Sequence, residues 1–291
     1  MVSIENTTEI TDEEMNSNWT ESVDTFDELN LKKDLLRGIY AYGFEKPSSI
    51  QQKAILPIIK GRDVIAQAQS GSGKTGAFAI GSLEAIDLSK LEVQTLVLAP
   101  TRELAQQIYD VYNYIGEFLK VKVLNLIGGT QVKDSIKSLE NGVHIVVGSP
   151  GRVLDMLKKN FLKLAYLKCL ILDEADDLLS KGFLDNMKEI ISLIPPECRI
   201  NLFSATMPKE IVQLTTNFMN NPAKILVKNE EVTLLGIKQY YVTLKKEWKL
   251  DTLMNLYKGL DIAQAIIFCN SKRTVESLTD EMKKKGHMVD R

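Results

Sequence analysis

The chain has 291 residues, of which 44% are hydrophobic and 25% charged, as in an ordinary soluble globular protein of one large or two smaller domains. It has no apolar stretch long enough to cross a membrane, and its three cysteines and two histidines are too scattered to predict a Cys/His metal site. We therefore expect a protein of a reducing intracellular compartment, and its acidic, polar start argues against a signal or transit peptide.

The formal net charge of −2 is unevenly distributed along the chain. Residues 1–24 contain seven acidic side chains and no basic one, so the remaining residues carry 36 basic against 31 acidic side chains, a net charge of +5. That excess is too small for a broad electrostatic footprint, so any nucleic-acid site must be local. Residues 1–24 also lack periodicity and are predicted to form a disordered tail.

Apolar runs alternate with segments of helical periodicity over most of the chain, after an extended stretch and short helix predicted within 26–43. Strands are predicted at 64–66, 95–99, 123–127, 144–147, 167–172, 200–204 and 225–227. Helices are predicted at 50–59, 75–88, 102–118, 132–140, 151–159, 185–193 and 210–218. This alternation predicts an α/β fold, a parallel sheet with helices on both faces.

The pattern breaks near residues 229–236, where we place a linker. Beyond it, strands are predicted at 239–244 and 263–269, and helices at 248–257 and 275–285. Two strands supply too little apolar surface for an independent domain of usual size, so residues 237–291 are interpreted as the incomplete start of a second α/β domain.

The first motif that carries chemistry is A-Q-S-G-S-G-K-T, which follows a predicted strand and precedes a helix. Gly71 and Gly73 let the backbone curl so that its N–H groups face a phosphate, while Lys74 supplies charge and the Thr75 hydroxyl holds Mg²⁺. The usual pattern starts with glycine rather than Ala68. A flexible turn is the alternative, but the flanking elements favour nucleotide binding, with Lys74 reachable by solvent. The predicted binding residues of this loop are Ala68, Gln69, Ser70, Gly71, Ser72, Gly73, Lys74 and Thr75.

A pair of carboxylates follows the strand predicted at 167–172. At the carboxyl end of a neighbouring parallel strand, Asp173 and Glu174 would face the same crevice as the loop. Asp173 would bind Mg²⁺ through water, and Glu174 would polarise the attacking water for cleavage of the γ-phosphate. An acidic turn that caps the next helix is the alternative. We expect Lys74, Asp173 and Glu174 to be the catalytic residues.

These two motifs together resemble the DEAD-box family of ATP-dependent RNA helicases, in which D-E-A-D follows A-x-x-G-x-G-K-T. Residues 43–51, G-F-E-K-P-S-S-I-Q, are similar to the segment that reads adenine in this family. The resemblance implies that Gln51 pairs with adenine, that Phe44 stacks on it and that Phe26 is the upstream aromatic. Taken alone, either phenylalanine would more often be a core residue.

Three further segments resemble the RNA-contacting motifs of the family. Arg102 and Arg152, each at the start of a predicted helix, would bind phosphate through paired N–H groups of the guanidinium. Nothing in these segments is suited to recognise base edges. The resemblance therefore implies sequence-independent recognition of single-stranded RNA, although surface ion pairs are the more common use of any single arginine. The predicted RNA-binding residues are Pro100, Thr101, Arg102, Gly128, Gly129, Ser149, Pro150, Gly151 and Arg152.

The tripeptide S-A-T resembles the segment that couples nucleotide state to RNA binding in the family, and its hydroxyls, on Ser204 and Thr206, would bond to Asp176. Residues 266–270 resemble the first motif of the second lobe. There are mild departures: Ser72 replaces a threonine, and Asp177-Leu178 replaces Glu-Met.

The resemblance implies a RecA-like domain at 25–228, followed by the start of a second RecA-like domain, with ATP and Mg²⁺ as cofactors. Within the family, residues 36–48 and 223–234 are most similar to members that act in translation initiation, with exon-junction members next. We thus expect a cytoplasmic monomer that contacts scaffold proteins of the initiation complex, or a nuclear location for an exon-junction protein.

We also expect the arginine fingers of the second lobe to lie beyond residue 291, so that this chain alone would hydrolyse little ATP. Two alternatives remain. One is an RNA-binding or partner-binding module that is gated by nucleotide and has little turnover. The other is a P-loop kinase or other ATPase without a nucleic-acid role, which leaves the segments around Arg102 and Arg152 unexplained.

Overall fold

The computed structural model describes residues 17–180, 182–226, 238, 240–260 and 264–291. The chain divides into two compact units, Met1–Leu235 and Gly236–Arg291. The predicted linker at 229–236 lies outside the described residues. No helix in the described part of the chain has the length and apolar character needed to cross a membrane.

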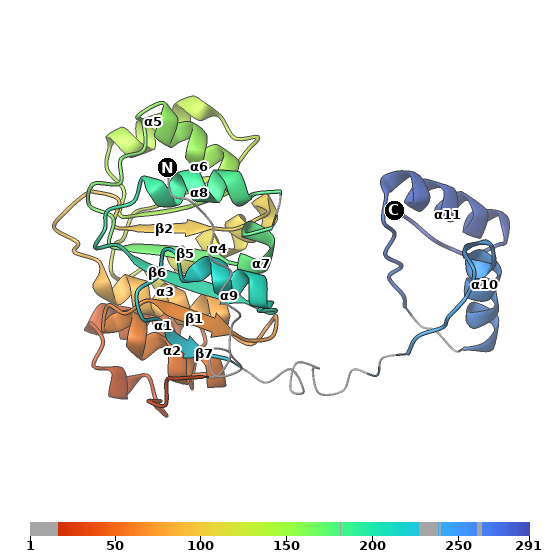
Figure 1. The fold of residues 1–291 in the computed structure, drawn as a ribbon, viewed down its shortest axis with the longest axis horizontal. Helices are drawn as coiled ribbons and strands as arrows, with labels where there is room; N and C mark the ends of the chain where they lie inside the picture. Colours follow the sequence, from red (N-terminus) through yellow and green to blue (C-terminus); the bar gives the residue numbers. More distant parts are fainter. Residues whose placement is uncertain (1–16, 181, 227–237, 239, 261–263) are drawn as a thin grey trace. The chain divides into compact units, whose positions relative to one another are not determined.

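The first unit is built on a parallel sheet, as the alternating pattern predicts (Figure 1). In the described residues the sheet has seven strands in the order β3-β4-β2-β5-β6-β1-β7. The strands are β1 (Val64–Gln67), β2 (Thr95–Leu98), β3 (Val123–Leu126), β4 (Ile145–Gly148), β5 (Cys169–Asp173), β6 (Arg199–Ser204) and β7 (Ala223–Ile225). Because every pairing is parallel, all carboxyl ends meet at one edge of the sheet, which is where ligands bind in open α/β folds.

Helices cover both faces of this sheet, which confirms the predicted layers (Figure 1). One core cluster joins the sheet to α1, α2, α3 and α4, and a second joins the opposite face to α6, α7, α8 and α9. The helices are α1 (Lys33–Ala41), α2 (Ser49–Ile59), α3 (Lys74–Ala85), α4 (Arg102–Ile115), α5 (Val132–Glu140), α6 (Pro150–Lys158), α7 (Ala175–Leu178), α8 (Leu184–Ser192) and α9 (Lys209–Thr215).

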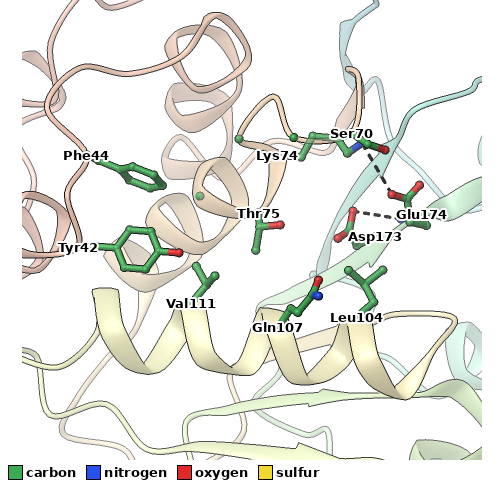
Figure 2. A pocket seen from close by; sticks show the side chains of 13 residues that line it. Tyr42, Phe44, Ser70, Lys74, Thr75, Leu104, Gln107, Val111, Asp173 and Glu174 are labelled. Atoms are coloured by element: carbon green, nitrogen blue, oxygen red, sulfur yellow. Dashed lines mark hydrogen bonds and ion pairs between the residues drawn. The ribbon is translucent and has the colours of Figure 1, made fainter. Parts of the chain in front are cut away.

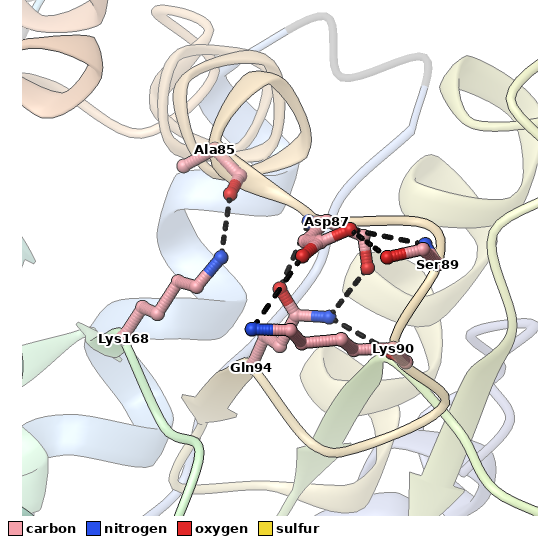
Figure 3. A network of polar contacts seen from close by, with 6 residues as sticks. All are labelled: Ala85, Asp87, Ser89, Lys90, Gln94 and Lys168. Atoms are coloured by element: carbon pink, nitrogen blue, oxygen red, sulfur yellow. Dashed lines mark hydrogen bonds and ion pairs between the residues drawn. The ribbon is translucent and has the colours of Figure 1, made fainter.

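Helix α3 ends three residues earlier than its periodicity predicts, because side chains take over the carbonyls of its last turn. Lys168 donates to the Ala85 carbonyl at 3.3 Å (Figure 3), and Lys32 donates to the carbonyls on either side of Ala85. The buried Gln94 holds the following loop in place. Its side-chain oxygen accepts from the N–H of Asp87, and its side-chain nitrogen donates to the Asp87 carbonyl. Ammonium groups at this end also complement the helix dipole.

The predicted disordered tail is wrong for residues 17–24, which pack on the first unit. Trp19 and Val23 are buried in the core, and the backbone N–H of Asn18 donates to the Lys224 carbonyl at 3.1 Å. These two apolar side chains bury enough surface to hold the segment in place, although the surrounding residues are polar. Residues 1–16 lie outside the described part of the chain.

The second unit contains the two predicted helices, α10 (Lys249–Gly259) and α11 (Lys272–Lys284). The two predicted strands are wrong for the described residues 240–244 and 264–269, which form no strand. Ile266 and Phe268 are 82% and 90% exposed, so this apolar run is not covered within the described residues. A strand needs neighbouring strands to complete its hydrogen bonds, and apolar pattern alone does not supply them.

Candidate active site and nucleic-acid interface

The phosphate loop runs from the end of β1 to the start of α3, as the motif predicts. Gly71 and Gly73 have φ angles of +78° and +98°, a left-handed region that favours glycine. A Cβ atom on Gly73 would also lie 2.8 Å from the amide nitrogen of Gln51. Ala68 can replace the usual first glycine because it is not among the residues with positive φ.

The structure places Lys74 inside the loop rather than in solvent, which corrects the expectation of a solvent-reachable side chain. Lys74 is 6% exposed, and its ammonium donates to the Ala68 carbonyl at 2.9 Å. The same nitrogen lies 3.9 Å from Oε1 of Glu174. The loop backbone and the Glu174 carboxylate therefore hold the ammonium inside the loop.

Two carboxylates stand at the end of β5, directly beside the loop. Asp173 is 2% exposed, and one of its oxygens accepts from the N–H of Glu174 at 3.1 Å. Burial, and then the negative charge of Glu174, raise the pKa of Asp173 to about 7, although Lys74 pulls it down. Glu174 has a φ of +48°, so the chain turns sharply between the strand and α7. A buried carboxylate at this edge is prepared for a cation.

This raised pKa has a consequence for stability. The carboxylate of Asp173 ionises in the unfolded chain near pH 4 but in the folded chain only near pH 7, so folding loses stability as the pH rises through this window. Asp173→Asn removes that cost and is expected to stabilise the nucleotide-free protein at pH 8 by about 4 kcal/mol, with little effect at pH 4.

Urea denaturation at the two pH values measures this difference. A Trp248→Phe background leaves Trp19 as the one tryptophan, so that its fluorescence reports on the first unit. Asp177→Asn, at an exposed neighbour, is the matched control and should change stability equally at both pH values. A gain for Asp173→Asn that is independent of pH would contradict the assigned ionisation.

A cavity of about 430 Å³ lies between the phosphate loop, the end of β5 and one face of α4 (Figure 2). Among the predicted residues it brings together Phe44, Ser70, Gly71, Gly73, Lys74, Thr75, Asp173 and Glu174. Sequence reasoning missed Tyr42, Gly76, Leu104, Gln107 and Val111. The helical spacing of the last three places them on one face of a helix, but the sequence does not say that this face meets the loop.

Two residues predicted to bind adenine do not line this cavity. Phe26 is fully buried and stacks on Phe44, with ring centroids 6.3 Å apart, so it supports this half-buried aromatic ring. The Gln51 side chain accepts from the N–H of Ser48 at 2.9 Å and donates to the Gly73 carbonyl at 3.2 Å. In this structure its amide therefore ties α2 to the phosphate loop. Ala68, Gln69 and Ser72 also lie outside the cavity lining.

The three predicted RNA-contacting segments converge at the carboxyl ends of β2, β3 and β4. The Arg102 guanidinium lies against Gly128 and Gly129, since a Cβ atom on either glycine would be 2.9 Å from one of its nitrogens. Arg152 donates to the Thr130 carbonyl at 3.3 Å. No acidic residue in the described ranges forms an ion pair with either arginine, so the ion-pair alternative receives no support.

The remaining residues of these segments shape the helix starts. The Thr101 hydroxyl accepts from the N–H of Leu104 at 3.2 Å and caps α4, directly after Pro100. Pro150 occupies the first turn of α6, with Ser149 before it and the exposed Gly151 after it. Both helices thus start at this surface, where their N-terminal dipoles favour anions.

The predicted coupling contact is present for one of the two hydroxyls. Thr206 donates a hydrogen bond to the carboxylate of Asp176, which joins the end of β6 to α7. Ser204 is fully buried and accepts from the N–H of Thr206 at 3.3 Å instead. The contact lies two residues beyond Glu174, so it joins the end of β6 to the segment that follows the Asp173–Glu174 pair.

Comparisons with known proteins show the family of this chain. The DEAD/DEAH box helicase family matches residues 48–214. The ATP-dependent RNA helicase eIF4A of Pyricularia oryzae is 54% identical over 270 residues, which cover 92% of this chain and 68% of that protein. The eukaryotic initiation factor 4A of Drosophila melanogaster is 54% identical over 267 residues, 91% of this chain and 66% of its own length.

Solved structures resemble the chain as well. Dbp5 of S. cerevisiae bound to RNA and ADP BeF3 has a TM-score of 0.80 and 35% identity, with 92% of this chain and 68% of that chain covered. A DEAD box protein from Methanococcus jannaschii has a TM-score of 0.69 at 35% identity, covering 91% and 71%. With its fold, its phosphate loop and its D-E-A-D sequence, the chain belongs to the DEAD-box family of ATP-dependent RNA helicases.

Proposed function

We propose that this chain is an ATP-dependent RNA helicase that acts in translation initiation. The observation that carries the proposal is the convergence of the phosphate loop and the Asp173–Glu174 pair on one cavity, at the sheet edge that also carries Arg102 and Arg152. The relatives named eIF4A support the role in initiation, and with it a cytoplasmic location and contacts with scaffold proteins of the initiation complex.

In this proposal the chain's own residues bind and orient ATP. The loop backbone cradles the phosphates, Lys74 neutralises their charge, and Phe44 offers its face to the base. Glu174, 28% exposed and beside Lys74, is placed to orient an attacking water and accept its proton. Burial and the charge of Glu174 disfavour the ionised form of Asp173 and raise its pKa, so a bound cation would stabilise this carboxylate.

The donor set fits magnesium. Thr75 and Asp173 would hold the ion, and both present oxygen, the ligand type that Mg²⁺ prefers. The described residues contain no cluster of three or more His, Cys, Asp or Glu side chains for a metal, which suits an ion that keeps most of its water and binds through one carboxylate and phosphate. When bound, the ion would shield the negative charge that develops on the phosphates.

RNA would be held along its backbone. The two arginines and the helix starts at Thr101 and Pro150 offer phosphate donors but no set of side chains for base edges, so binding should be independent of sequence. The Thr206–Asp176 contact supports communication between nucleotide and RNA, because it ties the catalytic strand end to its neighbour.

Arg102→Ala and Arg152→Ala are expected to weaken the binding of single-stranded RNA equally for different sequences. Each should also reduce the slope of log K against log salt by about 1, because one phosphate contact is lost. Fluorescence anisotropy with labelled oligo(U), oligo(A) and mixed-sequence RNA at several salt concentrations measures both effects.

The matched control is Arg199→Ala, an exposed arginine at the amino end of β6, on the opposite edge of the sheet. It should leave RNA affinity and the salt slope unchanged. If Arg102→Ala and Arg152→Ala bind RNA like the parent, or alter sequence preference instead, the proposed RNA surface is wrong.

A further inference from the structure

One face of α4 forms a wall of the nucleotide cavity. Leu104, Gln107 and Val111 follow each other at spacings of three and four residues, and all three line it. Leu104 and Val111 are half-buried and apolar, so the carboxamide of Gln107 is the polar group on this wall. Figure 2 shows its side chain directed from α4 toward the space below Thr75 and Asp173.

Two adjacent glutamines of α4 differ in their hydrogen bonding. Gln106 donates to Asp110 at 2.9 Å and accepts from the Asn125 amide at 2.8 Å, so it joins α4 to β3. Gln107 is exposed and bonds to no residue in the described part of the chain. Its donor and its acceptor therefore remain free to bind groups that enter the cavity.

We propose that Gln107 is a further positioning residue of the nucleotide site, with its carboxamide hydrogen-bonded to water between the terminal phosphate and the Thr75–Asp173 pair. This inference rests on the proposed function. A neutral amide suits the position, since it donates and accepts without adding charge beside the carboxylates. It cannot take up a proton, so proton transfer remains with Glu174.

Gln107 shares its helix with the proposed RNA contact Arg102. Arg102 starts the same helix five residues earlier, which is about 7.5 Å along the axis at 1.5 Å per residue. A rigid helix transmits a shift at its first turn to its second turn. Gln107 is thus the polar cavity residue closest along the chain to the proposed RNA contact.

Calorimetric titration of ATP into the 291-residue chain tests the inference, once with excess Mg²⁺ and once with EDTA. Gln107→Leu, which conserves size, should weaken binding in Mg²⁺ by about 3- to 10-fold, since one hydrogen bond through ordered water is lost. In EDTA it should bind ATP like the parent. Gln107→Asn, with a shorter amide, should lie between the two.

Gln106→Leu is the matched control, since it removes an adjacent glutamine that faces away from the cavity, and it should leave both affinities unchanged. Equal affinities for Gln107→Leu and the parent would overturn the inference. So would an equal loss in Mg²⁺ and EDTA with a lower unfolding midpoint, because that result indicates a packing role. Lys74→Ala separates the two hypotheses: if it too binds ATP normally, the proposed function itself fails.

Discussion

Lys74→Ala is expected to weaken ATP binding about 100-fold. The ammonium is buried between the Ala68 carbonyl and the Glu174 carboxylate, so it is already oriented and largely desolvated before ATP arrives. With ATP bound, the ammonium and a phosphate oxygen would form a desolvated charge pair, and removal of one member of such a pair costs about 2–5 kcal/mol, far more than the loss of a surface charge. The variant also leaves the phosphates without a compensating side-chain charge.

Calorimetric titration with ATP and Mg²⁺ measures this loss. The fold should persist, because α3 keeps its glycine turn and its core contacts, and the far-ultraviolet circular dichroism spectrum checks this. Lys53→Ala, at an exposed lysine of α2, is the matched control and should bind ATP like the parent. Equal ATP affinities for Lys74→Ala and the parent would contradict the assignment of residues 68–75 as a phosphate-binding loop.

Glu174→Gln is expected to lower the rate of ATP hydrolysis by about 10²- to 10⁴-fold, the usual contribution of a positioned general base. ATP binding should remain, because the amide keeps the size of the side chain and removes a negative charge that would face the phosphates. The substitution should also lower the pKa of Asp173, since the charge of Glu174 is one cause of its elevation. The pH below which Mg²⁺-dependent ATP binding is lost should therefore fall.

Single-turnover hydrolysis with protein in excess over labelled ATP measures the rate, including slow rates, and calorimetry from pH 5 to pH 8 measures the binding. Asp177→Asn is the control, because it changes an exposed carboxylate three residues away. A parental hydrolysis rate in Glu174→Gln would exclude this residue as the general base. Loss of ATP binding together with hydrolysis would indicate a structural role instead.

Much of the first unit could be predicted, because each element depends on local pattern. The helix at 132–140 has the predicted limits, and each strand of the sheet lies within two residues of its predicted position where it is described. The differences come from tertiary contacts. Helix α3 stops at Ala85 because Lys32 and Lys168 cap its last turn, and no local sequence signal reports those lysines.

The second unit shows the limit of pattern reasoning. Residues 264–269 have the apolar, β-branched composition of a buried strand, but they form none. Composition describes what a segment can bury, whereas a strand exists only where neighbours accept its hydrogen bonds. The helices α10 and α11 complete their hydrogen bonds internally and were therefore predictable.

The candidate site was predictable where glycine geometry and charge make a local motif, as at 68–75 and at Asp173–Glu174. The wall formed by α4 was not, because its residues become part of the cavity only when the helix packs beside the loop. Sequence reasoning also left Lys74 in solvent and assigned the amide of Gln51 to adenine. The structure instead buries the lysine, and it bonds the Gln51 amide to the protein backbone as well; both contacts are consequences of packing, and the adenine role of Gln51 stays a prediction.

Hydrogen–deuterium exchange of the 291-residue chain tests the central assignment most directly. One sample contains millimolar ATP with Mg²⁺, a second contains single-stranded RNA, and a third contains neither. ATP should protect amides at 68–76 and 173–174, and RNA should protect those at 101–104, 128–130 and 149–152. Protection by ATP away from 68–76 and 173–174, or an RNA footprint away from the ends of β2, β3 and β4, would contradict the account.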